Sequence, residues 1–113
     1  MMDQDETMAD HILIADANGV WRRFDHGNMS GIHWDEIFRI TGYRFDYRIS
    51  VVTVLEFDFE HGEYLELQSD TPGFDQVLLA IIKRFQILPQ MIDQLNGMSH
   101  GDEPIELWSK IKA

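Results

Sequence analysis

The most regular pattern of apolar and polar positions runs over residues 51–68. As far as Phe59, the odd-numbered positions carry Val, Thr, Leu or Phe, and the even-numbered positions of the second half are acidic. The alternation resumes after His61-Gly62, where Leu65 and Leu67 are separated by an acidic residue. A period of two residues is typical of a strand with one buried face. This segment therefore predicts a β-hairpin whose odd-numbered residues are buried.

The register of this hairpin follows from the rule that cross-strand partners share a face. A two-residue loop at His61-Gly62 would pair Phe57 with Glu66, which sets a core residue opposite a solvent-facing one. A three-residue loop, residues 60–62, keeps the odd-numbered residues together: Phe59 with Glu63, Phe57 with Leu65, and Leu55 with Leu67. That loop needs a left-handed residue at its last position, and Gly62 provides it. We therefore predict the three-residue loop.

An opening hairpin is predicted near the start of the chain. Residues 11–15 and 20–24 are β-rich runs that flank Asp16-Ala17-Asn18-Gly19, whose Asn and Gly favour a tight turn. The glycines and short polar residues of 25–31 then predict a loop.

Residues 32–41 predict a further strand, because their apolar residues fit a period of two everywhere except at Glu36. Gly42 is expected to break or bulge this strand. Residues 43–50 are expected to form either a connection or another strand.

Beyond residue 70 the apolar spacing becomes helical. Thr71 is expected to cap a helix that has Pro72 at its first position. The buried side of this helix carries Phe74, Val77, Leu78, Ile81, Ile82 and Phe85. Pro89 either ends the helix or begins a second one, which stops at Asn96-Gly97. Residues 104–112 predict a last short helix by the same spacing.

Strands followed by helices predict an α+β fold, an antiparallel β-meander closed by a packed C-terminal helix and a short helical tail. Residues 1–10 are expected to be a disordered acidic tail, and residues 11–113 a single domain. Four strings carry a resemblance: Trp34-Asp35-Glu36-Ile37, Val51-Val52-Thr53-Val54-Leu55, Gly62-Glu63-Tyr64-Leu65-Glu66-Leu67, and Gly73-Phe74 before an apolar helix. Between residues 12 and 85 the chain resembles small bacterial pleckstrin-homology-like proteins, which implies a meander with a C-terminal helix and implies no chemistry.

The charge balance narrows the choice of partner. The 113 residues include 20 acidic and 9 basic ones, for a net charge of −11. Direct binding of nucleic acid depends on Lys and Arg, so this balance disfavours it and favours a basic protein partner. The N-terminus is acidic where a signal peptide is basic, and the longest apolar run, residues 77–82, is far too short to span a membrane. We therefore expect a cytoplasmic protein that does not bind membranes.

The sequence offers little catalytic chemistry. Without cysteine there is no thiolate metal site and no thiol nucleophile. The five histidines show no spacing typical of a metal site, and no serine lies in a GxSxG string. Asp16-x-Asn18-Gly19 resembles the start of a calcium loop but lacks the later ligands, so a turn is preferred. We expect no enzyme activity, no catalytic residue, no metal and no cofactor.

One feature stands out in the distribution of charge. Between Arg48 and Lys83 there are seven acidic residues and no Lys or Arg. In the predicted register Glu56 faces Glu66 directly, and like charges opposite each other destabilise a sheet. A solvated face that prevents edge-to-edge aggregation is the plain interpretation. The alternative, a partner-binding surface, comprises Glu56, Asp58, Glu60, Glu63, Tyr64 and Glu66.

Two functions follow, and the sequence leaves both open. The chain is similar in type to acidic bacterial immunity proteins, which implies an inhibitor whose acidic hairpin occupies the basic active cleft of a nuclease toxin. The other function is that of a pleckstrin-homology-like adaptor without inhibitory activity, which makes its contact through Trp21, Trp34 or Trp108. A homodimer is a further expectation, because the edge of the hairpin offers a second copy a strand to pair with.

Overall fold

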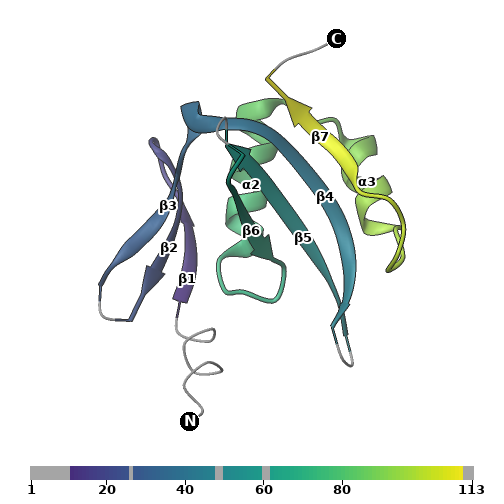
Figure 1. The fold of residues 1–113 in the computed structure, drawn as a ribbon, viewed down its shortest axis with the longest axis horizontal. Helices are drawn as coiled ribbons and strands as arrows, with labels where there is room; N and C mark the ends of the chain where they lie inside the picture. Colours follow the sequence, from purple (N-terminus) through teal and green to yellow (C-terminus); the bar gives the residue numbers. More distant parts are fainter. Residues whose placement is uncertain (1–10, 26, 48–49, 60–61, 111–113) are drawn as a thin grey trace.

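The computed structural model describes residues 11–25, 27–47, 50–59 and 62–110. Over these residues the chain forms two antiparallel sheets and two helices (Figure 1). The three-stranded sheet has the order β1-β2-β3, with β1 His11–Ala15, β2 Gly19–Phe24 and β3 Met29–His33. The four-stranded sheet has the order β6-β5-β4-β7, with β4 Ile37–Tyr47, β5 Ser50–Phe59, β6 Tyr64–Gln68 and β7 Ile105–Ser109. The helices are α2 Phe74–Phe85 and α3 Pro89–Asn96, and a 3-10 turn, η1, covers Trp34–Glu36. The α+β class is therefore confirmed, but with two sheets in place of one meander.

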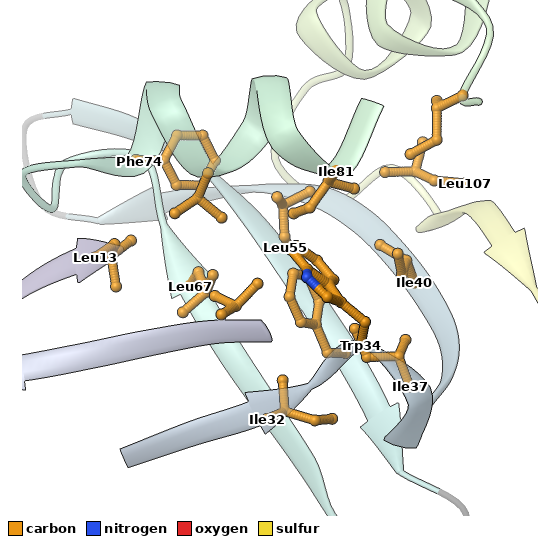
Figure 2. Packing of buried hydrophobic residues seen from close by; sticks show 14 of the residues in the cluster. Leu13, Ile32, Trp34, Ile37, Ile40, Leu55, Leu67, Phe74, Ile81 and Leu107 are labelled. Atoms are coloured by element: carbon orange, nitrogen blue, oxygen red, sulfur yellow. The ribbon is translucent and has the colours of Figure 1, made fainter. Parts of the chain in front are cut away.

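The core lies between the two sheets and α2 (Figure 2). Leu13 of β1 and Ile32 of β3 face Leu55 of β5, and Ile81 of α2 closes the space above them. Phe57 is completely buried in the same cluster. Burying one such side chain stabilises a fold by about 1.5–3 kcal/mol. The odd-numbered face of the central hairpin therefore anchors the four-stranded sheet to the helix.

The predicted hairpin register is confirmed. Leu55 pairs with Leu67 and Phe57 with Leu65. The Phe59 N–H donates to the Glu63 carbonyl at 2.8 Å, and Gly62 has the positive φ of 89° that the three-residue loop requires. The loop residues 60 and 61 lie outside the described residues.

The burial pattern of β5 differs from the prediction in its first half. Val51 is exposed, whereas Val52 and Val54 are buried. Their cross-strand partners on β4 are the aromatic Phe45 and Tyr43, whose rings lie beside them on the even-numbered face. That face is apolar at one end of the hairpin and acidic at the other.

The opening hairpin is confirmed, but the single strand predicted over residues 32–41 is interrupted: residues 32–33 end β3, residues 34–36 form η1, and residues 37–41 begin β4. Residues 29–31, predicted as loop, belong to β3, and the chain then turns at η1 before β4 begins. The His33 N–H donates to the Glu36 carboxylate at 3.0 Å, and the Trp34 indole donates to the Asp16 carbonyl at 2.9 Å. A continuous strand would have pointed Glu36 into the core. The turn keeps it exposed and lets Ile37 be buried in its place.

Gly42 neither breaks nor bulges β4. It lies in the middle of the strand, and a Cβ atom there would come within 3.0 Å of the Leu95 side chain of α3. The glycine therefore makes room for α3 on the same face that carries Leu55. Beyond it, β4 continues to Tyr47, so residues 43–47 are strand and no connection.

The first predicted helix begins later than expected, after a segment that bonds to β1. The Leu13 N–H donates to the Pro72 carbonyl at 2.8 Å, and α2 begins only at Phe74, with Gly73 at its N-cap in place of Thr71. The second helix, α3, begins at Pro89 and ends before Gly97 as expected.

The last predicted helix is wrong, because residues 105–109 form β7. Ile105 pairs with Gly42 and Trp108 with Ile40, and a bulge between these pairs places Leu107 as an extra residue. In a regular strand Ile105 and Trp108 would face opposite sides. The bulge turns both side chains toward the core, so two apolar residues three positions apart lie on one face of a strand, although this spacing is typical of a helix.

Candidate interaction surface

One row of side chains crosses all four strands of the larger sheet. Glu106 of β7 pairs with Thr41 of β4, Thr41 pairs with Glu56 of β5, and Glu56 pairs with Glu66 of β6. Because cross-strand partners share a face, these side chains lie together. The opposite face of the sheet carries Leu55, which packs with Ile81 of α2 (Figure 2), so the row lies on the side turned away from α2. We call this surface the acidic face, which comprises Arg39, Thr41, Tyr43, Glu56, Asp58, Tyr64, Glu66 and Glu106.

The structure brings together four of the six residues predicted for partner binding. Glu56, Asp58, Tyr64 and Glu66 lie on the acidic face, and the Tyr64 side chain is 61% exposed. Glu63 is exposed just before β6. Glu60 lies outside the described residues.

The prediction missed Arg39, Tyr43 and Glu106. Arg39 and Tyr43 alternate with Thr41 along β4, but nothing in the sequence indicated that this strand pairs with residues 50–59. The prediction missed Glu106 because residues 104–112 were expected to form a helix. The acidic face therefore draws on four strands, whereas the sequence pointed to two.

Arg39 modifies the charge of the acidic face. Its Nε atom lies 2.9 Å from Asp58 Oδ2, and the two side chains are 47% and 15% exposed. The hydrogen bond and the charge of Asp58 raise the pKa of Arg39. Between Arg48 and Lys83 the sequence has no Lys or Arg, but the fold brings the cation Arg39 of the neighbouring strand β4 onto this face. Asp58 is thus partly neutralised, and the unbalanced charge lies on the glutamates.

Glu56 is the most perturbed carboxyl group of the acidic face. Its pKa is raised to about 7 because the protonated acid donates a hydrogen bond to Asp58, burial disfavours its charge, and Asp58 and Glu66 repel it. Arg39 opposes this shift. The charge of Glu56 therefore changes with pH near neutrality.

Glu66 is held by two other residues. The Tyr43 hydroxyl donates to Glu66 Oε2 at 2.7 Å, and burial and this bond raise the pKa of Tyr43, which stays a neutral donor. Arg22 of β2 donates to the Glu66 carbonyl at 2.6 Å. Burial lowers the pKa of Arg22 while Glu66 raises it, and a guanidinium stays charged in either case.

The contact from Arg22 bears on self-association. The Glu66 carbonyl belongs to β6, which is an edge strand of the four-stranded sheet. A second copy that paired with this edge would have to displace Arg22 at that position. The homodimer through the hairpin edge remains a prediction, and this contact disfavours it.

The acidic face can accept hydrogen bonds from cations on an open surface. Among the described residues, no group of three or more His, Asp or Glu side chains is placed to hold a metal ion. The carboxylates are spread over three strands, β7, β5 and β6, an arrangement that suits several cationic side chains better than one ion. In the same part of the chain, neither helix has the length and apolar character needed to cross a membrane.

The three tryptophans lie near the turn at Asp16 and around the ring of Phe85. Trp21 donates its indole N–H to Asp16 Oδ1 at 2.9 Å, and the same oxygen accepts the N–H groups of Asn18 and Gly19. Asp16 therefore closes a turn, as the sequence indicated. Trp34 donates its indole N–H to the carbonyl of the same Asp16, and its ring also contacts that of Phe85, which in turn contacts Trp108.

The chain matches no protein-family model, no curated protein and no solved structure. The resemblance to pleckstrin-homology-like proteins and the similarity in type to immunity proteins therefore stay expectations from sequence. The function proposed below therefore rests on the surfaces of this chain.

Proposed function

We propose that the protein binds a basic protein partner through the acidic face and acts as an immunity protein, an inhibitor that neutralises a nuclease-type bacterial toxin by covering its active cleft. The observation that carries this proposal is the row of Glu106, Glu56 and Glu66, which lie on β7, β5 and β6 with Thr41 of β4 between the first two. A nuclease binds phosphate through Lys and Arg, and a row of carboxylates can compete for the same side chains.

The energetics of the row support an interface. Glu56 and Glu66 are direct cross-strand neighbours, and such a like-charged pair destabilises a sheet by up to about 1 kcal/mol. A cationic partner would remove this repulsion, and the net charge of −11 would speed the encounter. Tyr64 is an exposed aromatic residue of the kind that anchors interfaces.

The test begins with capture of proteins from the native source at low salt and their elution in rising salt. A basic protein should elute as the salt screens the charges. It should degrade nucleic acid, and this protein should inhibit it. Recovery of only neutral or salt-insensitive partners would contradict the proposal.

A pair of variants then locates the interface. Glu56→Gln with Glu106→Gln removes two charges from the acidic face and should abolish inhibition at pH 8 without unfolding the protein. Asp93→Asn with Glu103→Gln removes two exposed charges elsewhere and should leave inhibition intact. Equal loss in both double variants would indicate that only net charge matters.

The adaptor function remains the second candidate, because aromatic side chains gather around Phe85. Phe85 lies 5.9 Å from the ring of Trp34 and 4.5 Å from that of Trp108. Binding through this cluster would be insensitive to salt and unaffected by Glu56→Gln with Glu106→Gln, which separates it from the inhibitor.

A further inference from the structure

A hollow of about 760 Å³ lies where the end of α2, the turn η1 and the end of β7 meet. Its lining includes Trp34, Asp35, Arg84, Phe85, Trp108 and Lys110. Its volume is in the range of small-ligand pockets. The proposed inhibitor function makes no use of it, since the hollow lies on the α2 side of the sheet and the acidic face on the other.

The floor of the hollow is aromatic. The Trp34 ring is almost completely buried beneath it, and Phe85 lies between Trp34 and Trp108, with both in edge or tilted contact. Trp108 reaches this place because the bulge at Leu107 turns it toward the core side of β7. Such a floor suits a flat, apolar group.

The rim of the hollow is basic, although the protein as a whole is strongly acidic. The Arg84 guanidinium lies 5.1 Å from the centre of the Trp34 ring, and Lys110 Nζ donates to the Asp35 carbonyl at 3.2 Å. Within the described residues Arg84 forms no ion pair.

The backbone of Gln86, which also lines the hollow, has a left-handed conformation. It is the C-cap of α2 with φ 55° and ψ 47°, and it is the only non-glycine among the described residues with positive φ. Glycine adopts this conformation at lower cost and is the common residue at such a helix end. Gln86 lines the hollow, so its amide can hydrogen-bond a bound molecule.

We propose that this hollow binds the C-terminal end of a peptide whose last side chain is aromatic. The ring would lie on Phe85 and Trp108, and the carboxylate would pair with Arg84 at the rim. The single charge of Arg84, which forms no ion pair in the described part of the chain, matches one carboxylate better than a phosphoryl group, which carries nearly two negative charges at neutral pH. The carbonyls at the end of α2 repel an anion, and Lys83 and Arg84 in its last turn offset that field.

N-acetyl-L-phenylalanine is the probe, and N-acetyl-L-phenylalaninamide is its neutral counterpart. Binding is read from the fluorescence and the indole N–H NMR signals of the tryptophans in the intact protein. The acid should shift the signals of Trp34 and Trp108 and leave that of Trp21 unchanged. The amide should bind about tenfold more weakly, because it lacks the charge-assisted bonds.

Neighbouring variants on α2 separate contact from overall charge. Arg84→Gln should weaken binding of the acid about tenfold. Lys83→Gln removes the same charge from the same helix, but Lys83 is not part of the lining, so its effect should stay below about threefold. The proposal is overturned if the acid and the amide bind equally, if neither binds at millimolar concentration, or if inorganic phosphate binds more tightly than the acid. Because the acid and the amide are compared on the wild-type protein, the test does not depend on the folding of any variant.

Discussion

Glu56→Gln is expected to stabilise the protein at alkaline pH. The wild-type carboxyl group has a pKa raised from 4.5 to about 7, so the folded protein holds this proton more tightly than the unfolded chain does. The stability that Glu56 contributes is therefore complete below about pH 4.5 and is lost as the pH rises through 7. Glutamine has the shape of the protonated acid and donates to Asp58 at every pH.

The size of the effect follows from the shift. A change from 4.5 to 7 corresponds to about 3 kcal/mol if the whole shift acts on folding. Because Glu56 is only partly buried, solvent screening reduces this to about 1 kcal/mol. For a domain of this size, such a difference moves the melting temperature by about 4 °C.

The assay is urea unfolding of wild type and Glu56→Gln at pH 4, 5.5, 7 and 8. The two proteins should be equally stable at pH 4, and the variant should become more stable by about 1 kcal/mol at pH 8. Glu63→Gln, an exposed neighbour on the same hairpin, is the control and should follow the wild type. Parallel curves for wild type and Glu56→Gln, or a less stable variant at pH 8, would refute the reasoning about the carboxyl pair.

Three further predictions concern stability and can be checked by urea unfolding at pH 7. Phe57→Ala should cost about 3–5 kcal/mol, because the ring is completely buried between the sheet and α2; a loss below 1 kcal/mol would contradict the assigned core. Tyr43→Phe should cost about 1 kcal/mol through loss of the hydrogen bond to Glu66, and this cost should vanish in a Glu66→Ala background, which has no side-chain acceptor. Gln86→Gly should stabilise the protein by about 0.5–1 kcal/mol, since it relieves the left-handed backbone; destabilisation would mean that the glutamine side chain holds the end of α2.

The central hairpin could be predicted because one physical rule fixes it. Pairing Phe57 with any acidic residue would have placed a core side chain opposite solvent, so the face rule selected one loop length. The turn at Asp16 was equally local, because the carboxylate and the two N–H groups that it accepts lie within three residues.

The remaining errors came from contacts between distant segments. The bulge in β7 gives Ile105 and Trp108 a helical spacing within a strand, and only the pairing with β4 reveals it. The ion pair of Arg39 with Asp58 joins two strands whose register the sequence did not determine. The acidic character of the hairpin was visible in the sequence, but the glutamate row and the basic hollow depend on where β7 attaches.

The strand β7 has a consequence for how the protein opens. Through one bulge it gives Glu106 to the acidic face and Trp108 to the hollow. It is an edge strand of five residues, and its partner β4 lies far earlier in the sequence. Contacts between such distant segments form slowly, and a short edge strand is expected to be among the first elements lost in partial unfolding. Detachment of β7 alone would dismantle both surfaces at once while leaving the core hairpin β5-β6 paired. The two surfaces therefore share one local opening equilibrium, and a ligand that holds β7 in place at either of them makes the other more persistent.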